Sequence, residues 1–118
     1  MIEVRILKEK SNDSERLAGF IMKGHADSDV RGKDLVCCAA STLATDSVNA
    51  LTGVLNIKEG LSLEFKPGFM EVKVDKCGDD EKEKLIQFAL EVFSYNINQL
   101  KDQYPQYFNI ETKKGKTR

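Results

Sequence analysis

Two segments of this 118-residue chain follow the same order: two short runs in which apolar and polar residues alternate, and then a longer run with apolar residues every three or four positions. Alternation with a period of two predicts β-strands, and spacing of three or four predicts a helix packed by one face. The order therefore predicts two β-hairpins, each followed by an α-helix. The runs are 1–8, 17–24 and 35–55 in the first segment and 61–65, 70–74 and 80–100 in the second.

Turn signals separate these runs. Residues 11–14 and the Pro67-Gly68 pair are of the types that favour tight turns. Pro105 ends the second helix, because proline lacks the amide hydrogen that a helix interior needs, and residues 107–111 are expected to add a short edge strand. The whole pattern predicts an α+β fold: an antiparallel or mixed sheet with both helices packed on one face.

Composition indicates one globular domain, which we assign to residues 1–112, followed by a basic tail at 113–118. The formal net charge is −1 and the isoelectric point about 5.9, so the chain lacks the positive field typical of nucleic-acid binding, and no direct nucleic-acid contact is expected. No apolar run approaches a membrane span, and the first residues lack a signal-peptide pattern. Three cysteines, two of them adjacent, form no disulfide framework. These features predict a cytoplasmic protein without a membrane partner.

A histidine and a cysteine border the segment between the first hairpin and the first helix. His25, the one histidine of the chain, follows Gly24 at the end of an alternating run, and Cys37 lies near the start of the helical run. An imidazole within hydrogen-bond reach and the positive end of a helix dipole both favour the reactive thiolate of a cysteine. We therefore predict a cysteine hydrolase site with His25 as base and Cys37 as nucleophile. Gly24, before the histidine, permits a close backbone approach or an unusual φ.

Three further residues are candidates for supporting roles. Asp34 is placed to cap the helix or to orient the histidine, and capping is favoured. Ser41 lies one helical turn beyond Cys37, on the same stripe, where it could hold the thiolate or the substrate by a hydrogen bond. Cys38 projects in a different direction, and we interpret it and Cys77 as small core residues. Unpaired N–H groups at the helix start, around Cys37 and Cys38, are expected to stabilise an oxyanion.

The segment 26–33 is polar and contains a glycine. Such a segment has little to bury, so we expect a mobile loop that substrate orders. A disordered peptide tail could then thread beneath it and pair with a strand edge.

These residues resemble a known family. Gly24-His25-Ala26, a loop, and Asp34-Leu35-Val36-Cys37 followed by a helix with Ser41 are similar to the motifs of the bacterial ribosomal-processing cysteine protease family Prp. The resemblance implies a cytoplasmic, homodimeric endopeptidase. No cofactor or metal is expected. Its implied substrate is the precursor of ribosomal large-subunit protein twenty-seven, whose N-terminal extension is removed by a cut after an aromatic pair. Cys38 departs from the family pattern, in which a small residue such as alanine is expected.

Three other interpretations of these residues are possible. A metal site would use His25 and the three cysteines, but adjacent cysteines diverge on a helix and no C-x-x-C spacing is present. A disulfide between Cys37 and Cys38 would strain the backbone. The main alternative is a noncatalytic ribosome-associated or RNA-binding assembly factor that uses the tail 113–118 and a dimer surface, although the chain has no tryptophan and no evident stacking face.

Overall fold

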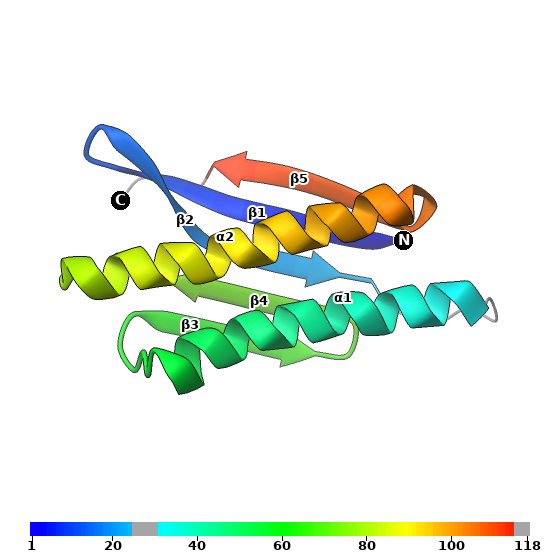
Figure 1. Ribbon diagram of the computed structural model, residues 1–118, viewed down its shortest axis with the longest axis horizontal. Coiled ribbons are helices and arrows are strands. Elements are labelled where there is room, and N and C mark those ends of the chain that lie inside the picture. Colours follow the sequence, from blue (N-terminus) through cyan, green and yellow to red (C-terminus); the bar gives the residue numbers. More distant parts are fainter. Residues whose placement is uncertain (25–30, 115–118) are drawn as a thin grey trace.

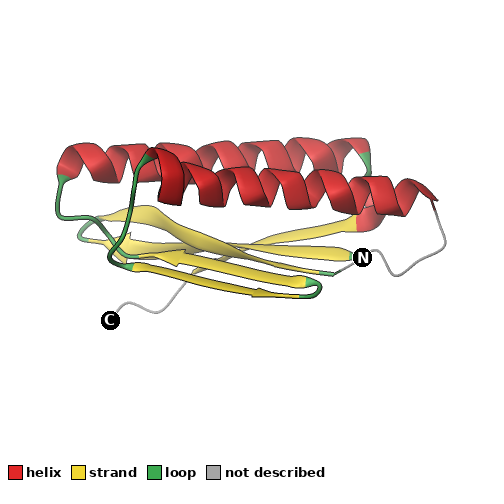
Figure 2. Cartoon of the chain, turned by 90° about the horizontal axis from the view of Figure 1, so that it is seen from below, coloured by secondary structure: helices red, strands yellow, loops and turns green. Residues whose placement is uncertain are grey.

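The computed structural model describes residues 1–24 and 31–114, with the backbone alone at 31–34. It has two layers, a sheet and a pair of helices that cover one of its faces (Figures 1 and 2). The predicted α+β class, with two hairpins each followed by a helix, is confirmed. The elements in order are β1 (Ile2–Ser11), β2 (Ser14–Lys23), α1 (Arg31–Asn49), a π-helical turn (Ala50–Val54), β3 (Leu61–Lys66), β4 (Phe69–Val74), α2 (Asp80–Gln103), a 3-10 turn (Pro105–Tyr107) and β5 (Phe108–Lys114).

The sheet has five strands in the order β3-β4-β2-β1-β5. The three pairings among β1 to β4 are antiparallel, whereas β5 pairs with β1 in parallel, so the sheet is mixed. The edge strand expected at 107–111 is present and extends further, to Lys114. Lys113 and Lys114, which were expected in the basic tail, are therefore strand residues; 115–118 lie outside the described residues.

The core lies between the sheet and the two helices. Phe20 of β2 stacks on Phe93 of α2 with ring centroids 3.9 Å apart, which fixes α2 over the middle of the sheet. The largest fully buried side chains come from both layers: Phe20, Leu51, Ile86, Ile97, Val4 and Val72. Within the described residues no helix is long and apolar enough to cross a membrane.

The first helix differs from its prediction at both ends. It begins at Arg31, four residues before the expected start at Leu35, so the expectation that Asp34 caps it is wrong. Gly32 lowers helix propensity by only about 1 kcal/mol, which does not stop the helix from extending by another turn. At the other end the π-helical turn shifts the phase of the apolar stripe, and Val54, an apolar residue of the predicted helical run 35–55, is 81% exposed.

A buried arginine joins three strands to α2 at one end of the sheet. Arg16 of β2 is 6% exposed. Its Nε donates to Oε2 of Glu83 at 2.8 Å, and its Nη1 donates to Oε1 of Glu9 at 2.8 Å and to the Val74 carbonyl at 2.9 Å. The Glu83 carboxylate also accepts from the backbone N–H of Cys77 at 3.0 Å. We call this the distal end, because the turn of the first hairpin lies there, away from the end of β2 and the start of α1 (Figure 1).

One glutamine completes the distal end. The pairing of β1 with β2 shifts register between Leu7 and Lys8, where β2 bulges. Next to this bulge, the backbone of Leu17 is bound by the side chain of Gln87: Oε1 accepts from its N–H at 2.7 Å and Nε2 donates to its carbonyl at 2.8 Å. The amide of Gln87 thus satisfies backbone groups beside the irregular pairing.

Candidate active site

Gly24 ends the second strand in a backbone conformation that requires glycine. Its φ is +114°, and a Cβ at this position would overlap the carbonyl oxygen of Met1. Its N–H donates to the carbonyl of Gly68, in the turn between β3 and β4, at 3.0 Å. Both predicted features of Gly24, a close backbone approach and an unusual φ, are confirmed. The chain therefore leaves the sheet toward residue 25 from a defined point.

His25 lies outside the described residues, as do residues 26–30 of the expected loop. Residues 31–33, also expected in that loop, form the start of α1. Figure 1 shows that the end of β2, the β3–β4 turn and the start of α1 lie at the same end of the molecule. We call it the site end.

Cys37 is the seventh residue of α1 and is partly buried, with contacts to the core. Ser41 follows one turn later on the same stripe and is exposed. Cys38 is exposed, so the interpretation of it as a core residue is wrong, whereas Cys77 does pack against the core. The carbonyl of Cys38 accepts from Oγ1 of Thr42 at 2.9 Å. The different exposure of the adjacent cysteines agrees with the predicted divergence of their side chains.

The early start of α1 changes the expected electrostatics of the thiol. Cys37 lies six residues, or about 9 Å, beyond Arg31. The N–H groups of an α-helix without an intrahelical partner are the first four, here those of residues 31–34, and the dipole effect fades beyond the first turn. The expectation that the amides of Cys37 and Cys38 form an oxyanion hole at the helix start is therefore wrong, and so is the expected support of the thiolate by the helix dipole.

The stripe that carries Cys37 lies on the flank of α1 that faces away from α2. Leu43, Asp46 and Ala50 line a groove against α2. At 100° per residue, Cys37 and Ser41 project from the opposite flank, with the core-facing residues between. Because α1 lies over β3 and β4 while α2 lies over β1 and β2, this opposite flank is on the β3 side of the molecule (Figure 1).

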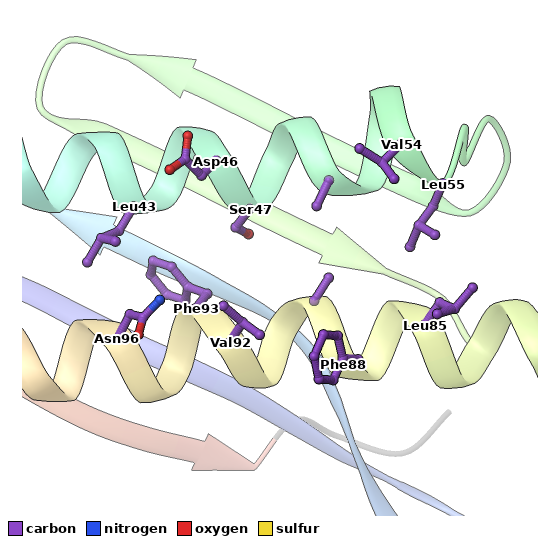
Figure 3. A pocket seen from close by; sticks show the side chains of 12 residues that line it. Leu43, Asp46, Ser47, Val54, Leu55, Leu85, Phe88, Val92, Phe93 and Asn96 are labelled. Atoms are coloured by element: carbon purple, nitrogen blue, oxygen red, sulfur yellow. The ribbon is translucent and has the colours of Figure 1, made fainter.

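The groove between the helices has a volume of about 330 Å³ and is mainly apolar (Figure 3). It contains none of the predicted site residues, so it is a surface separate from the thiol. From α1, the π-helical turn and the residue that follows it, the groove is lined by Leu43, Asp46, Ser47, Ala50, Val54 and Leu55, and from α2 by Leu85, Phe88, Ala89, Val92, Phe93 and Asn96.

No cluster of three or more histidine, cysteine or acidic residues with a geometry for a metal ion occurs in the described parts of the chain. Cys77 lies beside the distal end, on the segment between β4 and α2, whereas Cys37 is near the start of α1. The structure therefore does not bring together the cysteines of the alternative metal site.

Comparison with known proteins adds to this geometry. The sequence profile of the family described as "Cysteine protease Prp" matches residues 1–109. The "Ribosomal processing cysteine protease Prp" of Staphylococcus aureus strain Mu50 is 26% identical over 102 residues, which are 86% of this chain and 92% of that protein.

Solved structures show the same fold. That of SMU.848 from Streptococcus mutans has a TM-score of 0.77 at 28% identity and covers 98% of this chain and 96% of its own. That of the essential ribosomal processing protease Prp from S. aureus, in complex with a substrate peptide, has a TM-score of 0.76 at 26% identity and covers 96% of this chain and 100% of its own.

A mixed five-stranded sheet with two helices on one face is thus the fold of a class of cysteine proteases. The chain belongs to the cysteine protease Prp family. The resemblance noted from the motifs around Gly24 and Cys37 is confirmed at the level of the family.

Proposed function

We propose that this chain is a cysteine endopeptidase that removes the N-terminal extension of the precursor of ribosomal large-subunit protein twenty-seven by cutting after an aromatic pair. The observation that carries the proposal is the family match, which covers residues 1–109 and therefore both motifs. The S. aureus relatives are described as ribosomal processing proteases, one of them bound to a substrate peptide. A cytoplasmic location, where ribosomes assemble, fits this role.

In the proposed mechanism His25 accepts the thiol proton of Cys37, and the thiolate attacks the carbonyl carbon of the scissile bond. The protonated His25 then donates its proton to the leaving amine as the C–N bond breaks, which leaves a thioester. Water hydrolyses the thioester and regenerates the thiol. A product peptide linked covalently to S. aureus Prp supports a covalent intermediate.

The supporting residues have separate tasks in this proposal. Gly24 sets the direction in which the chain reaches His25, since its N–H is held by the Gly68 carbonyl at 3.0 Å. Ser41, exposed one turn from Cys37, is placed to hydrogen bond the thiolate or the substrate. Asp34, which does not cap α1, is proposed to orient the histidine. Cys38 has no proposed catalytic task.

Mass spectrometry of the ribosomal precursor before and after incubation tests the proposal directly. Wild-type protein is expected to release a peptide that ends in an aromatic pair, and Cys37→Ala and His25→Ala to release none. Cys38→Ala is the matched control and should cut normally. Loss of cutting in Cys38→Ala but not in Cys37→Ala would show that Cys38, not Cys37, is the nucleophile. A precursor that wild-type protein leaves uncut would contradict the proposed substrate.

We also propose that the protein acts as a homodimer through the outer face of α2. Four large side chains are exposed there at heptad spacing: Leu85 at 51%, Phe88 at 68%, Val92 at 41% and Tyr95 at 67%. An antiparallel second copy in the register that places Phe88 opposite Val92 also places Leu85 opposite Tyr95, so each apolar residue meets another.

Analytical ultracentrifugation checks the dimer. Phe88→Glu is expected to give monomers, because a carboxylate would be buried in an apolar interface. Phe65→Glu changes another exposed phenylalanine, on β3, and should leave the dimer intact. A wild-type protein that sediments as a monomer at all concentrations would contradict this part of the proposal.

A further inference from the structure

We infer that the outer edge of β3 binds the substrate as an added β-strand, with Phe65 contacting an apolar side chain of the peptide next to the scissile bond. This inference rests on the proposed function, since it concerns the peptide that Cys37 cleaves. It assigns a recognition surface and a specificity-determining residue.

The position of β3 in the sheet leaves its outer edge open to a peptide. β3 is the last strand on one side, and within residues 1–24 and 31–114 no strand pairs with its outer edge. Such an edge presents backbone N–H and C=O groups that an extended peptide can pair with. β5 forms the other edge, beyond β1. Only the β3 edge lies on the side of the molecule covered by α1 (Figures 1 and 2).

The thiol of Cys37 lies on the same side of the molecule as the β3 edge. Cys37 and Ser41 project from the flank of α1 that faces away from the groove shared with α2, which is the flank above the β3 side. β3 ends at Lys66, next to the turn whose Gly68 carbonyl accepts from Gly24. A peptide along the outer edge of β3 would therefore run at the foot of the helix flank that carries the thiol, toward the strand end from which residue 25 departs.

The side chains of β3 make one of its faces apolar and the other charged. Leu61, Leu63 and Phe65 alternate toward the helix layer, and their exposure increases along the strand, from half-buried at the two leucines to 54% at Phe65. The charged residues Glu64 and Lys66 lie on the other face, where they form an ion pair at 2.9 Å. The face of β3 toward the helix layer is thus apolar and uncharged, with its most accessible side chain at the site end.

These observations define the chemistry of the occupant. The edge binds an extended backbone, and the apolar row binds side chains at alternate positions of the peptide, since successive residues of a strand point to opposite faces. An aromatic residue adjacent to the cut suits Phe65, because aromatic pairs across neighbouring strands are favourable. β3 has six residues and spans about 20 Å, enough for a short peptide extension.

Kinetics with a peptide that contains the aromatic pair test the inference. Phe65→Ala is expected to raise KM at least tenfold and to change kcat less than threefold, because it weakens binding without touching the thiol. Lys66→Ala, a neighbouring exposed residue on the other face, is the matched control and should keep the wild-type KM. An unchanged KM in Phe65→Ala, while wild-type protein cuts the peptide, would overturn the inference and leave the proposed function intact.

Hydrogen exchange gives a second readout that does not depend on turnover. Binding of the same peptide to the Cys37→Ala protein is expected to slow exchange of the outward amides of residues 61–66 and to leave those of residues 108–114 unchanged. Protection at 108–114 instead would place the peptide on the opposite edge and contradict the inference. If wild-type protein cuts no such peptide, the proposed function itself fails, which these two measurements distinguish.

Discussion

The two ends of the molecule are held by different kinds of interaction. At the distal end, Arg16 and Glu83 join strands and helix through buried charged side chains, with N–O distances as short as 2.8 Å. At the site end, the described contacts that position Gly24 involve the backbone: its amide bound to the Gly68 carbonyl, and its Cα packed so closely on Met1 that no Cβ fits.

The interactions at the distal end therefore serve stability, and those at the site end serve the position of the reacting residues. A buried ion pair fixes an element firmly, but it occupies space and requires every charge to be satisfied. A glycine fixes only the path of the chain and places no side chain where the reaction must occur. We therefore expect substitutions at the distal end to affect mainly the free energy of unfolding, and substitutions at the site end to affect mainly activity.

The largest expected effect is at the distal end. Arg16→Met would leave the carboxylate of Glu83, whose side chain is only 12% exposed, without its cation, and breaking such a buried pair typically costs about 3–5 kcal/mol. Urea denaturation measures this loss. Lys66→Met removes one partner of an exposed pair and should cost less than about 1 kcal/mol. Equal losses in the two variants would show that the distal end is not held by its buried charges.

The next largest effect is expected at the site end. Gly24→Ala forces an alanine into φ +114° and against Met1, so we expect a loss of about 1–3 kcal/mol in stability and a fall in peptide cleavage of more than tenfold at temperatures where the protein stays folded. Gly53→Ala is the control, because a Cβ there meets nothing within 4 Å. Normal cleavage by Gly24→Ala would refute the role of this backbone in the site.

A smaller effect on stability is expected at Ser47, which lies in α1 between the two ends. Ser47 is 6% exposed and its Oγ has no hydrogen-bond partner in the described structure. Ser47→Ala removes a buried, unsatisfied hydroxyl and introduces a better helix former, so stability should rise by about 1 kcal/mol. Thr52→Val, which removes a hydroxyl bound to the Val48 carbonyl at 3.0 Å, is not expected to stabilise. A loss of stability in Ser47→Ala would mean that its hydroxyl has a partner in solution.

The smallest effect concerns a surface pair near the distal end. A hydrogen bond from Lys114 at 3.1 Å, and its charge, lower the pKa of Glu15 below the ordinary value of 4.5. A lowered carboxyl pKa contributes stability above the unfolded-state pKa, and this contribution is lost as the pH falls through the folded-state pKa. Lys114→Gln should raise the pKa of Glu15 in an NMR titration. The free energy of unfolding of Lys114→Gln should be lower than that of wild type at neutral pH, and the two values should converge in acid.

Much of the fold could be predicted from sequence because its elements have strong local patterns. Both hairpins, the turn at Pro67-Gly68 and the end of α2 before Pro105 follow from alternation and turn chemistry. The link between Arg16 and Glu83 could not, because it joins residues 67 positions apart and becomes visible only when β2 and α2 are packed together.

The candidate site was predictable to a similar extent. The backbone role of Gly24 and the stripe that Cys37 shares with Ser41 are local properties, and both were predicted. The start of α1 was not, because the polar residues after Arg31 carry no apolar periodicity, and tertiary context decides whether such residues join a helix. That error in one boundary placed Asp34, Cys37 and Cys38 too close to the helix terminus, and with them the expected oxyanion hole.

The parallel pairing of β1 with β5 has a consequence for how the protein folds. Ile2 pairs with Phe108, so the second side of a central strand is completed only by residues near the other end of the sequence. During synthesis, the first hairpin can form early, but β1 keeps one open edge until β5 has left the ribosome. Contacts of such large sequence separation form slowly, and an exposed strand edge favours aggregation in the meantime. The nascent chain is therefore most vulnerable just before its last strand appears.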